Sequence, residues 1–142
     1  MIDANILIYS VDASSRYHAE ARSWLTARLN GESRVAIPWL SIWAFLRVAT
    51  HQRALEHPLQ PEQAWEVVAA WLACDVVWTP GPTPRHAAVL ENLVREYALR
   101  GNLLTDGQLA AIAIEHGLGV YSTDTDFARF QEIRWTNPLI PN

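Results

Sequence analysis

Four aspartates are the residues of this chain best suited to chemistry. Asp3 follows the apolar start of the chain, Asp106 opens an expected helix, and Asp124 and Asp126 follow a second apolar segment. Clustered carboxylates repel one another and raise one another's pKa unless a cation lies among them. Oxygen ligands without Cys or His nearby favour Mg²⁺ or Mn²⁺ over Zn²⁺. Together, the four aspartates therefore predict a site for a hard divalent cation.

Each aspartate also has a structural interpretation. Asp106 could be a favourable charge in the first turn of a helix capped by Thr105. Thr123, followed by Asp126, resembles an imperfect capping box. Asp3 differs, because an aspartate at the end of an apolar strand is expected to have no capping role. The combination, rather than any one residue, favours the metal site.

Short apolar runs alternate with amphipathic segments, which predicts an α/β fold in three layers, α/β/α. The central sheet is expected to be mostly parallel, with about five short strands. The expected strands begin at Ile2 and cover 35–37, 75–79, 120–121 and 133–135. The expected helices cover 6–9, 17–29, 39–51, 62–74, 85–99, 106–116 and 124–130. Ligands of such sheets bind at the carboxyl ends of the strands, where the aspartates are expected to meet.

Length and composition limit the function classes. The 142 residues fit a single domain, 1–142, and a chain that is 50% hydrophobic and 18% charged is not disordered. No apolar run reaches the length of a membrane span, and no secretory signal is visible. The single cysteine, Cys74, has no partner for an internal disulfide, so we expect a cytoplasmic protein.

The charged residues exclude further classes of function. The net charge of −4 argues against a broad basic face for nucleic acid. All 11 basic residues are arginines. Phosphotransfer folds that need a lysine beside their acidic pocket, such as P-loop ATPases and receiver domains, are therefore excluded in their usual form.

Three motifs together resemble the PIN-domain ribonucleases, and more closely the VapC toxins of VapBC toxin–antitoxin pairs. They are Asp3-Ala4-Asn5 followed by Ile6 to Tyr9, Gly101 to Asp106, and Ser122 to Phe127. The resemblance spans nearly the whole chain. It implies a PIN fold and an endoribonuclease that uses Mg²⁺ or Mn²⁺ to hydrolyse RNA phosphodiester bonds.

The resemblance also implies roles for individual residues. Asp3 and Asp106 would be the principal metal ligands, and Asp124, the third catalytic residue, would complete the set of metal ligands or hold a metal-bound water. Asn5, Thr105 and Asp126 would support these ligands without binding the metal directly, Asn5 and Thr105 through hydrogen bonds. Asn5 and Thr105 could equally be turn and cap residues.

Two departures from the family pattern stand out. Many PIN domains carry a glutamate in the helix after the second strand, where this chain has Ala44. The loss of one carboxylate predicts weaker metal binding and leaves one or two metals as alternatives. Gly107 is a poor residue near a helix start, and its small size is expected to leave room at the site.

The resemblance implies an RNA substrate, a VapB-like antitoxin and a homodimer. Trp39 and Trp43 lie four residues apart on one expected helix and could line a groove for an antitoxin helix. Arg47 and Arg53 could contact RNA phosphates or the antitoxin, or be solvated charges. Periodicity assigns most of the tryptophans to the core or an interface rather than to base stacking.

Two alternatives remain. The lost glutamate allows a catalytically weak PIN-like module that binds RNA or its antitoxin. A flavodoxin-like small-ligand domain is disfavoured, because no Gly-rich phosphate loop follows the first strand.

Overall fold

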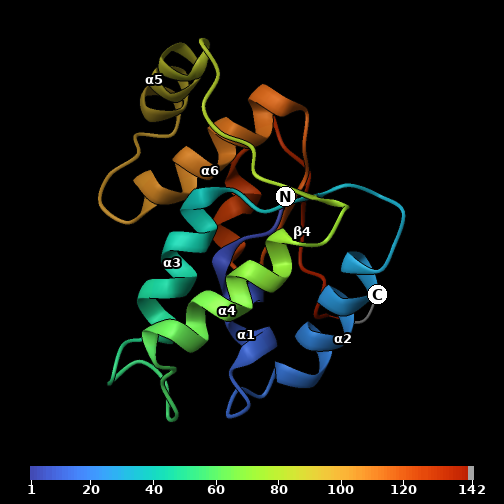
Figure 1. The fold of residues 1–142 in the computed structure, drawn as a ribbon. Helices are drawn as coiled ribbons and strands as arrows, with labels where there is room; N and C mark the ends of the chain where they lie inside the picture. Colours follow the sequence, from blue (N-terminus) through green and yellow to red (C-terminus); the bar gives the residue numbers. More distant parts are fainter. Residues whose placement is uncertain (141–142) are drawn as a thin grey trace.

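Helices surround a narrow sheet in residues 1–140, the part of the chain that the computed structural model describes (Figure 1). The strands have two residues each: β1 Val35–Ala36, β2 Val77–Trp78, β3 Val120–Tyr121 and β4 Trp135–Thr136. The helices are α1 Ala4–Val11, α2 His18–Leu29, α3 Trp39–Ala49, α4 Pro61–Leu72, α5 His86–Glu96, α6 Leu103–His116 and the 3₁₀ helix η1 Thr125–Arg129. Within residues 1–140, no helix combines the length and the hydropathy needed to cross a bilayer.

The start of the chain joins two parallel strand pairs, β1 with β2 and β3 with β4. Ile2 donates its backbone N–H to Ala36 O at 2.9 Å on one side, and Asp3 donates its own to Tyr121 O at 3.0 Å on the other. The spatial order is therefore β2, β1, residues 1–3, β3, β4. The expectation of about five strands is not confirmed, because Ile2 forms only an isolated bridge with Tyr121 before the chain turns into α1.

Two hydrophobic cores lie on opposite faces of this sheet. Val35 and Ile37 pack into one core, with residues of α1 to α4, whereas Ala36 packs into the other, with residues of α5 and α6. This alternation is the two-residue period of a strand buried on both faces. The helices form two layers accordingly, with α5 and α6 above the sheet in Figure 1 and α1 to α4 below it.

The helix that carries Asp106 begins earlier than expected. α6 starts at Leu103, so Thr105 lies inside its first turn, and the expectation that Thr105 caps this helix is wrong. Gly101, with φ 57°, ends the preceding loop, and the two leucines that follow are good helix formers. Gly117, with φ 64°, closes the helix in the left-handed conformation that glycine tolerates.

Candidate metal-binding site

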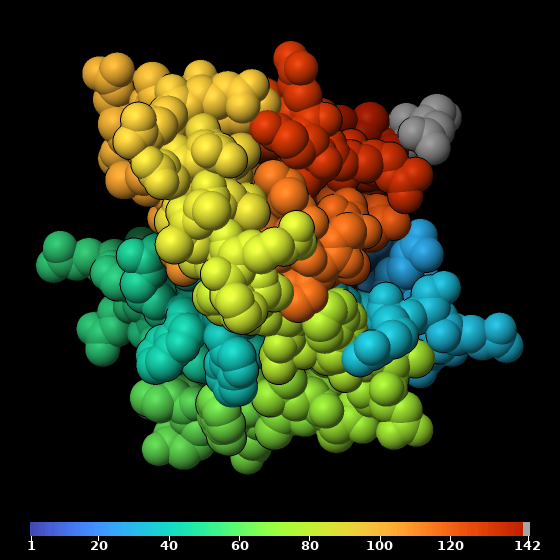
Figure 2. Space-filling view, turned by 90° about the horizontal axis from the view of Figure 1, so that it is seen from above, coloured from blue at the N-terminus to red at the C-terminus, as the bar shows by residue number. Residues whose placement is uncertain are grey.

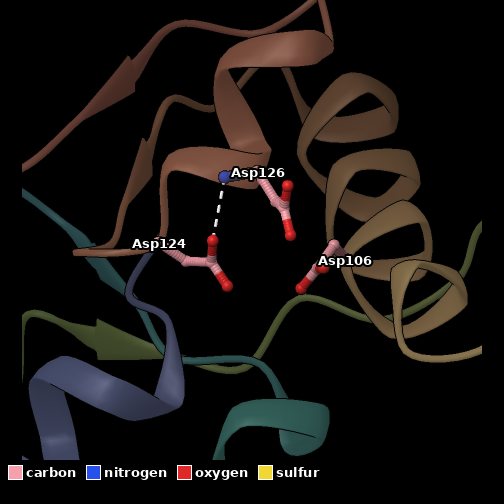
Figure 3. A group of neighbouring side chains, drawn as sticks. All are labelled: Asp106, Asp124 and Asp126. Atoms are coloured by element: carbon pink, nitrogen blue, oxygen red, sulfur yellow. Dashed lines mark hydrogen bonds between the residues drawn. The ribbon is translucent and has the colours of Figure 1, made fainter.

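Three carboxylates converge where α6 meets η1. Asp106, in the first turn of α6, faces Asp124 and Asp126, which lie at the start of η1 (Figure 3). One carboxylate oxygen from each lies within 4.8 Å of the others. This spacing fits one small divalent cation held by hard oxygen ligands.

The start of η1 fixes two of these aspartates relative to each other. Asp124 caps η1, and its Oδ1 accepts a hydrogen bond from the backbone N–H of Asp126 at 2.8 Å (Figure 3). Arg129 then binds Asp126, donating from Nη2 to Oδ1 at 2.6 Å and from Nε to the backbone carbonyl at 3.0 Å. Asp126 is thus shared between the carboxylate cluster and an arginine, whereas Asp124 is not paired with any cation among residues 1–140.

Asp3, at the centre of the sheet, lies close enough for its charge to raise the pKa of Asp106, but it is not one of the three carboxylates that lie within 4.8 Å of one another. Its Oδ2 accepts a hydrogen bond from the Ser122 hydroxyl at 2.6 Å, and its Oδ1 accepts one from the backbone N–H of Ala4 at 2.7 Å. Asp3 is therefore the N-cap of α1, and the expectation that it has no capping role is wrong. Only Met1 and Ile2 precede Asp3 in the sheet, so the chain passes directly from the sheet into α1 at this residue.

Ser122 organises this edge of the sheet and is a site residue that the motifs did not single out. Its fully buried hydroxyl donates to Asp3 and accepts from Asn5 Nδ2 at 2.9 Å and from the backbone N–H of Asp124 at 3.0 Å. Asn5 also accepts from the backbone N–H of Thr123 at 3.4 Å. Asn5 thus supports Asp3 through Ser122. A serine directly after a buried strand was the available signal.

Burial and the neighbouring negative charges raise the pKa of two of the aspartates, as expected for carboxylates grouped at a cation site. Partial burial, followed by the charges of Asp124 and Asp3, raises the pKa of Asp106 to about 6. Burial raises the pKa of Asp3, although the hydrogen bonds from Ser122 and Ala4 act in the opposite direction. A divalent cation would remove this repulsion, so the donor set fits Mg²⁺ or Mn²⁺.

The remaining positions that the sequence singled out near this site are Thr105, an expected support for the ligands, and Ala44 and Gly107, the two departures from the family pattern. Thr105 is exposed, and the hydrogen bonds found within residues 1–140 do not link its side chain to a carboxylate of the cluster. Ala44, half-buried on α3, offers no ligand. Gly107 makes room for the buried Leu99 side chain, which a Cβ at this position would strike. Its small size is therefore needed for packing in the core, and the expectation that it leaves room at the site is wrong.

An apolar groove of about 750 Å³ opens between α3 and α4 and extends to the start of α6. Trp43 on α3 and Trp65 on α4 line it, with side chains 67% and 49% exposed. Arg47 also lines this groove, whereas Trp39 and Arg53 are exposed but lie outside its lining. Ala44 and Thr105 connect the groove to the neighbourhood of Asp106.

A parallel α/β sheet with clustered carboxylates at its carboxyl edge defines an α/β domain with a candidate divalent-cation site. The chain belongs to the PIN domain family, whose model matches residues 1–133. It is 38% identical to ribonuclease VapC37 of Mycobacterium tuberculosis, over 97% of this chain and 96% of the relative. It is 36% identical to ribonuclease VapC33 of the same species, over 96% of each chain.

Solved structures share the fold. The crystal structure of VapBC2 from Rickettsia felis, bound to a DNA fragment from its promoter, matches with a TM-score of 0.65 at 16% identity, over 96% of both chains. That of VapC20 of Mycobacterium tuberculosis, a toxin that cleaves the sarcin-ricin loop, matches with a TM-score of 0.65 at 20% identity. The latter match covers 94% of this chain and 97% of that one.

Proposed function

We propose that this protein is a metal-dependent endoribonuclease and the toxin of a type II toxin–antitoxin pair. The observation that carries the proposal is the convergence of Asp106, Asp124 and Asp126 at the carboxyl edge of a PIN-domain sheet. The ribonuclease names of relatives that match almost the whole chain support the reaction class.

Asp106 and Asp124 would hold Mg²⁺ or Mn²⁺, together with Asp3. A bound cation supplies Lewis acidity for water attack and offsets the charge that develops on the phosphodiester. Ser122 and Asn5 orient Asp3, and the backbone N–H of Asp126 orients Asp124. Arg129 partly neutralises Asp126, which leaves Asp126 a supporting rather than a principal ligand.

The test combines cleavage with metal binding. We expect purified protein, freed of its antitoxin, to cleave structured RNA with Mg²⁺ or Mn²⁺, and Asp3→Asn or Asp106→Asn to abolish cleavage. Calorimetric titration with Mn²⁺ should show binding that Asp106→Asn removes. Asp75→Asn, an exposed aspartate before β2, is the matched control and should change neither result. Cleavage that persists in both site variants would overturn the proposal.

The apolar groove supports an antitoxin partner. Trp43 and Arg47 would contact a VapB-like antitoxin segment there, with Trp39 and Arg53 on the surrounding surface. Trp43→Glu should leave RNA cleavage intact, while co-expressed antitoxin no longer relieves growth arrest. A homodimer in the cytoplasm completes this proposal, and sedimentation of the purified protein tests its oligomeric state.

The second candidate is a catalytically weak PIN module that works by binding. Ala44 favours it, because the site lacks the carboxylate that many PIN domains carry at this position. Mn²⁺ binding that is absent, or indifferent to Asp106→Asn, would support this candidate over the enzyme. Restoring the acid with Ala44→Glu should strengthen Mn²⁺ binding if the enzyme proposal is correct.

A further inference from the structure

A smaller cavity, of about 170 Å³, lies at the opposite edge of the sheet from the carboxylates. Its walls include Trp24 and Arg28 of α2, Ser33 and Arg34 just before β1, and Tyr121 of β3. Because the strands are parallel, residues that precede a strand and residues that follow one lie at opposite edges. In Figure 2 the cyan segment around residues 30–35 lies at one side of the molecule, and α3, in teal, lies at the other.

One wall of this cavity is an aromatic pair covered by a guanidinium. The rings of Trp24 and Tyr121 lie 4.9 Å apart, tilted by 57°. The Arg28 guanidinium carbon lies 5.3 Å from the centre of the Trp24 ring and 5.8 Å from that of Tyr121. An arginine held over a ring in this way keeps its N–H edge available to other partners.

A second arginine, Arg34, lines the same cavity. Its guanidinium lies over the ring of Trp78, 4.7 Å from the ring centre, at the rim of the cavity because Trp78 itself is outside the lining. The ion pairs found within residues 1–140 involve neither Arg28 nor Arg34, and no carboxylate lines the cavity. Ser33 also lines the cavity. The cavity therefore combines permanently charged donors with aromatic surface and has no acidic side chain to neutralise it.

We propose that this cavity binds a nucleoside phosphate. Guanidinium groups bind phosphate through paired N–H donors, and aromatic and guanidinium planes stack on bases. A cavity of about 150 Å³ holds one benzene ring, so this one takes a single phosphate or base, and the rest of the ligand lies outside. The ligand is a segment of an RNA strand or a free nucleotide, which share this chemistry. The lining residues are separate from the carboxylate cluster, so the site goes beyond the proposed catalytic function.

The test measures binding without catalysis. A short fluorescein-labelled oligoadenylate is titrated by anisotropy, and adenosine monophosphate by calorimetry, both at low salt with EDTA. The chelator keeps divalent cations from the acidic cluster, so the result is independent of whether the protein cleaves RNA. The double variant Arg28→Gln/Arg34→Gln should raise the Kd at least tenfold. The slope of log Kd against log salt for the oligonucleotide should fall by about 0.7 per lost phosphate contact.

Arg16→Gln is the matched control, because Arg16 also lies over a tyrosine ring, at 4.6 Å, but outside this cavity. It should leave the Kd within twofold of wild type. Arg28→Lys, which keeps the charge but loses the planar group, should give an intermediate loss and serves if the double variant melts early. Binding of the oligonucleotide alone identifies an RNA strand as the ligand, and equal binding of the monophosphate identifies a free nucleotide. No binding by wild type, or unchanged binding by the double variant, would overturn the proposal.

Discussion

The hydroxyl of Ser122 donates a hydrogen bond to Asp3 at 2.6 Å, although 119 positions separate the two residues in the sequence. The same oxygen accepts from Asn5 and from the backbone of Asp124. One buried hydroxyl thus connects the segment that carries Asp3 with the segment that carries Asp124. Its loss would remove one hydrogen bond each from the Asp3 carboxylate, the Asn5 amide and the backbone N–H of Asp124.

Ser122→Ala should destabilise the fold by about 1–3 kcal/mol, because it leaves buried polar groups unpaired. It should also weaken Mn²⁺ binding about tenfold, as loss of a residue that orients a ligand does elsewhere. Urea unfolding and calorimetric titration measure the two effects. Ser10→Ala is the control: Ser10 is also buried, and its hydroxyl donates to Leu7 O at 2.7 Å, away from the site. It should leave Mn²⁺ binding unchanged.

Asp106→Asn should stabilise the metal-free protein at pH 7 while removing its Mn²⁺ binding. The pKa of Asp106 is raised to about 6 in the folded protein, so its ionised form opposes folding at neutral pH. This penalty fades as the pH falls through 6 and is gone below about pH 4, where the carboxyl is protonated in the unfolded chain too. The Tm of the variant should therefore exceed that of wild type at pH 7 in EDTA and converge with it in acid. A lower Tm at neutral pH would contradict this account.

Glu115 should contribute stability that is lost in acid. Burial raises its pKa, but hydrogen bonds from Thr83 Oγ1, His86 Nδ1 and the backbone of Thr83 outweigh burial and leave the pKa below its usual value. A depressed pKa stabilises the fold above the unfolded value of about 4.5, and this contribution is lost as the pH falls through the folded value. Glu115→Gln should cost about 1–3 kcal/mol at pH 7 in urea unfolding, and less at low pH.

The control for Glu115 is Glu91→Gln. Glu91 pairs with Arg95 on the exposed face of α5, at 2.6 Å, and such pairs contribute little. Its loss should change the free energy of unfolding by less than about 0.5 kcal/mol. Equal effects of the two substitutions would show that the buried network of Glu115 has no special role.

Ala98→Gly should stabilise the protein. Ala98 has φ 48°, a left-handed conformation that costs an L-residue about 1–2 kcal/mol, and glycine adopts it without strain. The greater freedom of glycine in the unfolded chain offsets part of this gain, so we expect a net gain of up to about 1 kcal/mol. Ala88→Gly, in the exposed part of α5, should have the opposite sign and cost about 0.5–1 kcal/mol. Thermal melting of both variants tests the contrast.

The carboxylate cluster could be predicted from the sequence because the order of strands and helices alone places these residues at one edge of the sheet. Asp124 and Asp126 follow β3, and Asp106 lies in the first turn of the helix that returns to β3, so their convergence could be expected without knowledge of side-chain conformations. The same expectation included Asp3, which lies beside the three rather than among them. The roles of Ser122 and Arg129 were missed because they depend on side-chain contacts, which the order of strands and helices does not reveal. Their roles depend on which atoms they reach, and the partner of Ser122 lies at the other end of the chain.

Helix positions were predicted within a few residues, but exposure was not. Periodicity identifies the face on which Trp43 and Trp65 lie, yet it does not say whether another helix covers that face. Both tryptophans are exposed, whereas Trp71, on the same helix as Trp65, is buried against Phe45. The first strand was overestimated because Asp3 caps α1 so early that Ile2 alone is left to bridge to a neighbouring strand.

The central place of residues 1–3 in the sheet affects how the protein is made. Residues 1–3 are translated more than a hundred positions before their neighbour β3. Contacts between segments so far apart form late and slow folding. The carboxylates of Asp3 and Asp124 therefore come together only after β3 has been translated, so a nascent chain that has not yet reached β3 carries no assembled site.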